Sequence, residues 1–246
     1  MLRILIGGAM DSETRGLEES LLDPKTVDID GYRFTRGILG NAEVTAWKTQ
    51  MGKVNAALST YIGIKRFSPD IIINQGTAGA HSPLLNVRDI IVGESIINVD
   101  SYTTDQKASG KGYDIHDRSL MGIEVRDGEG WTEIRELISD RELVSICMDT
   151  PYAEGKLVKG IIGTGDGFNR EVDRIESIRN TFSTDCEEME SFAVAQVARN
   201  MEIPFIGFRV ISNSQPKNLN FDESTAQLCC RFSVEYIKRL NEAIDR

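Results

Sequence analysis

Short apolar runs alternate along this chain with longer amphipathic segments, and this alternation restricts the fold more than any other feature. Residues 70–74 have an unbroken apolar centre and lead into a glycine-rich stretch at 76–80. Continuous hydrophobicity over so short a span is typical of a strand that is buried on both faces of a sheet. We therefore expect an α/β fold in which a mixed central β-sheet is flanked by helices, within a single domain over residues 1–246.

The same patterns locate the individual elements. We expect strands at residues 2–6, 26–30, 32–39, 44–49, 70–74, 87–99, 157–164 and 204–212. We expect helices at residues 11–22, 54–67, 131–139, 171–179, 191–201 and 221–244. Polar residues dominate 100–130, which we interpret as a loop or insert and not as a linker between domains.

Charge and composition exclude several classes of function. Lys and Arg number 28 against 38 Asp and Glu, so the net charge is −10. Binding to nucleic acids or anionic membranes requires a basic protein surface, and an acidic chain does not provide one. We therefore expect neither as a partner. No run approaches the ~20 apolar residues of a membrane-spanning helix, and the apolar N-terminus is too short for a signal peptide.

Cysteine and histidine usage predicts a reduced protein without a metal site. The four cysteines form no CxxC pair, as expected of packing residues in a cytoplasmic protein. His81 and His116 are the only histidines, too few for a zinc site or a histidine-based triad. We expect no metal and no other cofactor.

Polar clusters follow the ends of four expected elements, at residues 9–13, 74–79, 164–168 and 209–213. In open α/β sheets, ligands gather at the carboxyl ends of the strands, although each cluster alone is also compatible with a tight turn. Arg209 lies within an otherwise apolar strand. Because a buried guanidinium is costly unless it is paired, we expect a carboxylate close to it.

The segment from Glu187 to Glu190 is acidic and leads into the helix expected at 191–201. A carboxylate in the first turn of a helix gains from the unpaired backbone N–H groups and the positive end of the helix dipole. Held ionised and in a fixed direction, it is suited to binding a sugar hydroxyl. Taken alone, the segment is more simply interpreted as an ordinary acidic helix start.

Together and in this order, these clusters resemble the 5′-methylthioadenosine/S-adenosylhomocysteine nucleosidases, a branch of the purine nucleoside phosphorylase and nucleosidase superfamily. The resemblance covers nearly the whole chain and is weakest between residues 100 and 160. It rests on Met-Gly-Lys-Val at 51–54, Asn-Gln-Gly-Thr-Ala-Gly at 74–79, Glu-Met-Glu at 188–190 and Arg-Val-Ile-Ser at 209–212. It implies a nucleoside phosphorylase-like domain, a small purine nucleoside as substrate and, with the apolar face of the helix at 54–67, a homodimer.

The resemblance also implies a role for each matching residue. Glu13 matches the carboxylate that deprotonates the attacking water, and Thr77 and Arg209 match the groups that share this water and hold the carboxylate. Phe168 matches the aromatic residue that stacks on the purine. The full set of implied substrate-binding residues is Met10, Met51, Gly79, Phe168, Glu188, Met189, Glu190, Ser212 and Phe221, with Glu190 on the ribose hydroxyls.

Cleavage of an N-ribosidic bond passes through an oxocarbenium-like sugar, so a glutamate base and a firmly held ribose supply much of what the reaction needs. Phosphorylases also need cations to hold phosphate, typically an arginine where this chain has the neutral Asn74. We therefore expect hydrolysis, with water as the nucleophile. Arg15 and Lys53 leave phosphorolysis as an alternative.

Two positions depart from the pattern of the nucleosidases. Asn213 occupies the place of an aspartate that donates a proton to the leaving adenine, and an asparagine cannot donate in that way. Because the rest of the chain matches the nucleosidase branch, we expect 5′-methylthioadenosine and S-adenosylhomocysteine as substrates, with slower release of adenine. The alternatives are a 6-oxopurine base, or a nucleoside-binding protein with weak catalysis. Asp105 would suit a polar 5′ group better than a methylthio group.

Overall fold

The computed structural model describes residues 1–111 and 117–244, so His116 lies outside the described residues. The strands are β1 (Leu2–Gly8), β2 (Leu22–Ile29), β3 (Tyr32–Leu39), β4 (Ala42–Lys48), β5 (Ile71–Ala80), β6 (Ile90–Asn98), β7 (Tyr102–Thr103), β8 (Ser119–Leu120), β9 (Ile123–Asp127), β10 (Gly130–Ile134), β11 (Leu137–Ile138), β12 (Leu157–Thr164), β13 (Cys186–Glu188) and β14 (Phe205–Asn213). The helices are α1 (Asp11–Glu18), α2 (Lys53–Phe67), α3 (Arg141–Met148), α4 (Val172–Phe182), α5 (Ser191–Asn200), α6 (Ser224–Ile244) and a 3₁₀ turn, η1 (Gln215–Lys217).

The central sheet is mixed, as expected, and β5 is at its middle. β5 pairs in parallel with β1 and β14, and antiparallel with the short β13. Because β14 also pairs with β6, β6 with β12, and β12 with β13, these strands close into a small ring with β5. On the other side, β1 continues the sheet through β4 and β3 to β2.

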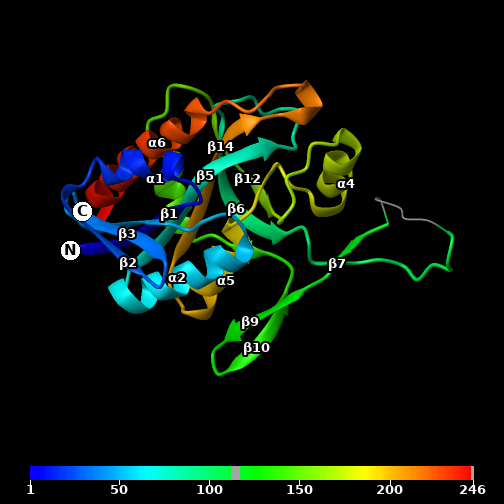
Figure 1. Cartoon of the computed structure of the whole chain (residues 1–246), viewed down its shortest axis with the longest axis horizontal. Coiled ribbons are helices and arrows are strands. Elements are labelled where there is room, and N and C mark those ends of the chain that lie inside the picture. Colours follow the sequence, from blue (N-terminus) through cyan, green and yellow to red (C-terminus); the bar gives the residue numbers. More distant parts are fainter. Residues whose placement is uncertain (112–116, 245–246) are drawn as a thin grey trace.

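Helices cover both faces of the sheet. Figure 1 shows α1 and α6 on one side of it, and α2 and α5 on the other. The alternation within β1 matches this arrangement: Ile4 and Ile6 belong to the core cluster with Phe232 of α6, while Leu5 belongs to the cluster with Ile64 of α2. Successive side chains of a strand point to opposite faces, so both faces of β1 are apolar and buried.

The prediction of a helix at 131–139 is wrong. The structure has β10 and β11 there, and Trp131 lies on a hairpin with β9 that projects from the body of the molecule (Figure 1). The sequence signal was the Asp127-Gly128 turn, where Gly128 has φ +59, flanked by residues that alternate in polarity. The helix begins later, with α3, where Asp140 Oδ1 accepts from the backbone N–H of Glu142 and Leu143.

The segment 100–130 is not a plain loop, because it contains β7, β8 and β9. The acidic segment before α5 also differs from the expectation: Glu187 and Glu188 belong to β13, and Glu190 immediately precedes α5.

All four cysteines are buried and free, as expected. No helix in the described part of the chain is both long and apolar enough to cross a membrane.

Candidate active site

Glu13 is held from four sides in the first turn of α1. Its Oε2 accepts from the backbone N–H of Ala9 at 2.8 Å and of Met10 at 3.1 Å. Its Oε1 accepts from the backbone N–H and the hydroxyl of Thr77, at 2.8 and 3.0 Å. These four donors fix the direction of the carboxylate, as a general base requires.

The end of β5 approaches this carboxylate very closely. A Cβ on Gly76 would lie 2.9 Å from Glu13 Oε1, so only glycine fits beside it. Along β5, every residue is buried except Thr77 and Gly79. Residues two apart on a strand share a face, so one face of β5 opens at these two positions.

Glu190 faces the same region from the start of α5. Its Oε1 accepts from the backbone N–H of Gly52 at 2.9 Å, which links the turn before α2 to the site. The pKa of Glu190 is raised to about 8, chiefly by burial and also by the charges of Glu188 and Glu13, against the lowering effect of Arg209. The charge of Glu13 contributes to the raised pKa of Glu190, so the two carboxyl groups expected to act in catalysis and in ribose binding lie close enough to interact electrostatically.

Arg209 has the buried carboxylate partner that its place in an apolar strand predicts. It forms an ion pair with Glu188 Oε2, and it also donates to the side-chain and backbone oxygens of Asn74. Its partner is thus Glu188 and not Glu13, which the resemblance had implied. Arg209 acts on the site by anchoring β13 beside β5 and β14.

Glu188 has both oxygens engaged within the protein. Oε2 accepts from Arg209 and from the backbone N–H of Glu190 at 3.0 Å, and Oε1 accepts from the hydroxyl of Thr164. Ser191 N–H donates to both oxygens. The expected stabilisation of a carboxylate by the first amides of α5 is therefore found at Glu188, but its substrate contact remains a prediction.

Asn213 is the last residue of β14, which pairs with β5. It pairs with Gly79, and a Cβ on Gly79 would lie 3.1 Å from Asn213 Nδ2. The hydroxyl of Ser212 lies 2.9 Å from Asn213 Oδ1 and 3.1 Å from the backbone oxygen of Ala78, and its single proton is within hydrogen-bond distance of both acceptors. The amide of Asn213 is thus oriented over the opening at Gly79.

Several apolar residues of the expected site are exposed. Phe168 is 64% exposed, Met51 63% and Phe221 46%, while Met10 and Met189 are half-buried. The loops that carry Phe168 and Met51 are joined, because Asp166 Oδ1 accepts from the backbone N–H of Lys53 at 3.0 Å. Exposed large apolar side chains around polar groups are typical of a surface that a ligand or partner covers.

Glu187 is not among the site residues expected from the sequence, but the structure places it in contact with Asn169, the residue that follows Phe168. Its Oε1 accepts from Asn169 Nδ2 at 2.7 Å, and its Oε2 lies 3.7 Å from His81 Nε2. Burial raises the pKa of Glu187 to about 7. Burial and the charges of nearby arginines lower the pKa of His81 to about 3, so this imidazole is neutral.

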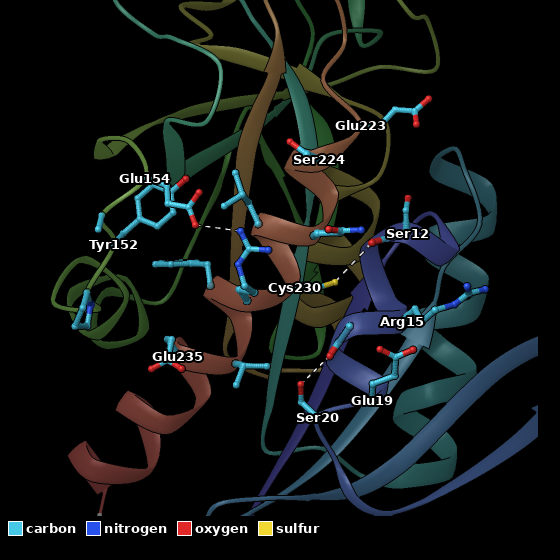
Figure 2. Close-up of a pocket in the computed structure, with 18 of the residues that line it drawn as sticks. Ser12, Arg15, Glu19, Ser20, Tyr152, Glu154, Glu223, Ser224, Cys230 and Glu235 are labelled. Atoms are coloured by element: carbon cyan, nitrogen blue, oxygen red, sulfur yellow. Dashed lines mark hydrogen bonds and ion pairs between the residues drawn. The ribbon is translucent and has the colours of Figure 1, made fainter.

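Lys53 and Arg15 are the two cationic residues for which phosphorolysis was kept as an alternative, and the structure gives each of them other contacts. Lys53 forms ion pairs with Asp100 and Asp166. Arg15 lines a different hollow of about 1020 Å³, between α1 and α6, which Figure 2 shows with Ser12, Glu19 and Cys230 around it. Neither side chain is placed to hold a phosphate beside Glu13. In the described residues no three His, Cys, Asp or Glu side chains group as metal ligands would.

The fold and this site define a member of a known enzyme superfamily. A family model of the Phosphorylase superfamily matches residues 3–240, and the chain belongs to that superfamily.

Individual relatives show which members of the superfamily the chain is similar to. The chain is 32% identical to the 5′-methylthioadenosine/S-adenosylhomocysteine nucleosidase of Bacillus cereus (strain B4264), over 98% of this chain and 99% of the relative. It is 26% identical, with a TM-score of 0.78 and 97% of each chain covered, to the S-adenosylhomocysteine nucleosidase from Streptococcus pyogenes solved with 5-methylthiotubericidin. The futalosine hydrolase of Helicobacter pylori strain 26695 shares the fold alone, at 23% identity and a TM-score of 0.79 over 96% of this chain and 97% of its own. The resemblance predicted from the sequence is confirmed.

Proposed function

We propose that this protein hydrolyses the N-ribosidic bond of purine nucleosides. The observation that carries the proposal is that Glu13, held by Thr77, and Glu190, held by Gly52, are near enough for the charge of Glu13 to act on Glu190. Relatives that are similar over their whole length are named as nucleosidases. Methylthioadenosine and S-adenosylhomocysteine, after which they are named, are therefore the first candidate substrates.

Glu13 supplies the base in this mechanism. A water molecule beside Oε1 of Glu13 and the hydroxyl of Thr77 loses its proton to the carboxylate as its oxygen attacks the anomeric carbon. The C–N bond to the purine breaks ahead of this attack, and the positive charge that develops on the sugar is stabilised by nearby carboxylates. A positioned general base contributes about 10²- to 10⁴-fold to such a rate.

Glu190 holds the ribose. A carboxyl group can accept from one hydroxyl and, when it is protonated, donate to the next, which suits a pair of neighbouring sugar hydroxyls. The raised pKa of Glu190, caused by its burial, gives access to both forms near neutral pH. Met189 beside it, with Met10, Met51 and Phe221, offers apolar contact to the sugar and its 5′ substituent.

The departing base needs a partner for its imidazole nitrogen. Asn213 Nδ2 can donate a hydrogen bond to that nitrogen, while Phe168 offers a ring for stacking. An amide stabilises the departing base without transferring a proton, so the base leaves with the electron pair of the broken C–N bond and takes its proton from solvent. Neutral Asn74, bound to Arg209, supports water and not phosphate as the nucleophile.

We also propose that the protein acts as a homodimer. The outer face of α2 carries exposed apolar side chains, with Val54 79%, Leu58 50% and Tyr61 47% exposed. A row of apolar side chains of this size on one helix favours burial against a partner. Because Met51 adjoins this face, the partner would lie next to the 5′ end of the substrate, where Asp105 is our candidate for contact.

The test is release of free base from purified protein in phosphate-free buffer, with methylthioadenosine, S-adenosylhomocysteine, adenosine and inosine as substrates. We expect base and free sugar in equal amounts. Release that depends strictly on phosphate, with ribose 1-phosphate as the product, would establish a phosphorylase instead. Binding without release from any purine nucleoside would favour the binding-protein alternative.

A further inference from the structure

Lys53 has no part in the mechanism above, yet it is the centre of a cluster of charged side chains. Its Nζ forms ion pairs with Asp100 and with Asp166, the latter at 3.3 Å. The lysine side chain is 19% exposed and the two aspartates are 40% and 52% exposed, so the ion pairs are partly shielded from water but remain open to salt. Both aspartates are distant from Lys53 in the sequence, so the cluster joins three separate segments of the chain.

The two aspartates lie just beyond the ends of neighbouring strands. Asp100 follows β6, which ends at Asn98, and Asp166 follows β12, which ends at Thr164. The strands run parallel, and Asn98 is paired with Thr164, so their carboxyl ends are adjacent. The backbone N–H of Asp166 also donates to Asp100 Oδ2 at 2.7 Å. The aspartates are therefore fixed to each other, and Lys53 joins the start of α2 to both of them.

The backbone at the start of α2 makes two further contacts. The first N–H groups of a helix have no partner within it and lie at the positive end of its dipole. Here the N–H of Gly52 donates to Glu190 Oε1 at 2.9 Å, and the N–H of Lys53 donates to Asp166 Oδ1 at 3.0 Å. Gly52 has φ +90, and a Cβ there would lie 3.3 Å from Asp166 Oδ1, so glycine suits this position. Carboxylates from two different segments thus meet at one helix end.

These contacts determine where the proposed substrate-binding residues lie. Met51 immediately precedes Gly52, and Phe168 follows Asp166 by two residues. Both side chains are largely exposed, so packing against the body of the protein does not hold them. Their positions relative to Glu190 depend instead on the contacts of the segments that carry them. If these segments were loose, nucleoside binding would have to order them, and such ordering costs affinity.

We infer that Lys53 is a positioning residue, which through Asp100 and Asp166 holds the segments of Met51 and Phe168 in place beside Glu190 before the nucleoside binds. The inference rests on the proposed function, because it gives Lys53 a task within that site. The ammonium group also separates two carboxylates that would otherwise repel each other. Its removal should therefore loosen the segment after β6 and the segment after β12 as well as the start of α2.

The experiment measures kcat and KM for methylthioadenosine in the wild type, Lys53→Met and Lys53→Arg. Lys53→Met keeps the backbone N–H and an apolar side chain of similar length, but it removes the charge. We expect it to raise KM about tenfold, which corresponds to about 1.4 kcal/mol, and to change kcat by less than about threefold. Lys53→Arg, which keeps the charge, should recover most of the affinity. Lys159→Met, which breaks the exposed ion pair of Lys159 with Glu94, is the control and should match the wild type.

The kinetic constants separate positioning from a merely structural role. A variant that has only lost stability contains less folded enzyme, so its apparent kcat falls while its KM is unchanged. Methylthioadenosine is uncharged, so salt should act on its KM through the ion pairs of the protein. Raising NaCl from about 0.05 to about 0.5 M should increase KM in the wild type and leave it unchanged in Lys53→Met.

A double-mutant cycle tests whether Lys53 acts through Asp166. Asp166→Asn removes the charge and keeps an oxygen that can accept from the N–H of Lys53. We expect this variant to raise KM, and the double variant Lys53→Met/Asp166→Asn to raise it by less than the product of the two single effects. Effects that multiply would mean that the two residues act independently, which contradicts the inference.

Three other results would overturn it: an unchanged KM in Lys53→Met, a fall in kcat alone, or the same salt dependence in both proteins. If no nucleoside is cleaved at all, the proposed function fails, and amide hydrogen exchange without ligand still tests the positioning. The N–H groups of Gly52 and Asp166 should then exchange faster in Lys53→Met than in the wild type and Lys159→Met. Equal exchange in the three proteins would show that Lys53 does not hold these segments.

Discussion

Arg209 and Glu188 form an ion pair in the interior of the protein, with each side chain 2% exposed. The pair connects β14 to β13, and the backbone N–H groups of Glu190 and Ser191 donate to the same carboxylate. One buried charge pair therefore sets the position of Glu190 relative to β5. The site depends on this pair although neither member needs to touch the substrate.

Breaking this pair should destabilise the protein strongly. Arg209→Met leaves the Glu188 carboxylate buried without its counter-charge, at a cost of about 3–5 kcal/mol in the free energy of unfolding. The double variant Arg209→Met/Glu188→Met should be more stable than either single variant, because no unpaired charge remains. Urea denaturation of the four proteins gives the coupling energy, and additive losses would contradict a coupled pair.

Removing the proposed base should abolish most turnover and leave the fold intact. Glu13→Gln keeps one acceptor oxygen but places an NH₂ group against the N–H donors of Ala9 or Thr77. We expect kcat to fall by about 10²- to 10⁴-fold, with a loss of about 1–3 kcal/mol in stability. Steady-state kinetics at saturating nucleoside, with Glu19→Gln as the control, measure the effect. A variant with near wild-type kcat would remove Glu13 from the mechanism.

The sequence predicts the central strands well because their apolar runs are long. It predicts that Arg209 needs a carboxylate, but not which one, since Glu188 reaches it through β13, whose three residues give no periodicity to detect. Glu187 is missed for the same reason: its burial follows from pairing with Gly79, more than a hundred residues away in the chain. Alternation of polarity at 123–134 is typical of a hairpin, and the expectation of a helix at 131–139 did not take it into account.

Asparagine at 213 should limit the release of adenine. Asn213→Asp introduces a group that, when protonated, can transfer a proton to the purine imidazole nitrogen, which the amide cannot do. We expect kcat/KM for adenosine to rise about tenfold or more, and the ratio of adenosine to inosine cleavage to increase. Base release followed by chromatography measures both. Tight nucleoside binding with no turnover in either protein would instead indicate a binding module.

A charge on the outer face of α2 should separate the proposed dimer. Val54→Asp places a carboxylate at an exposed apolar position, where burial against a second copy would be costly. We expect the wild type to sediment as a dimer at micromolar concentration and the variant as a monomer with unchanged circular dichroism. Lys65→Asp, on the same helix near its other end, is the control. A monomeric wild type would refute the proposal.

Stability should fall as pH rises through the neutral range, because of Glu190. Burial raises the pKa of this carboxyl from 4.5 to about 8 in the folded protein, so between these values the folded state holds a proton that the unfolded chain has lost. The stabilisation of the protonated form is complete below pH 4.5 and is lost as pH rises through about 8. Glu190→Gln has no such proton and still accepts from Gly52.

The variant should therefore gain stability relative to the wild type between pH 5 and pH 8.5. Urea denaturation of both proteins at each pH gives the difference in the free energy of unfolding. Glu19→Gln, which replaces an exposed carboxylate outside the proposed site, is again the control. A constant difference between wild type and Glu190→Gln across this range would mean that Glu190 is ionised in the folded protein, and that it binds the ribose as an acceptor only.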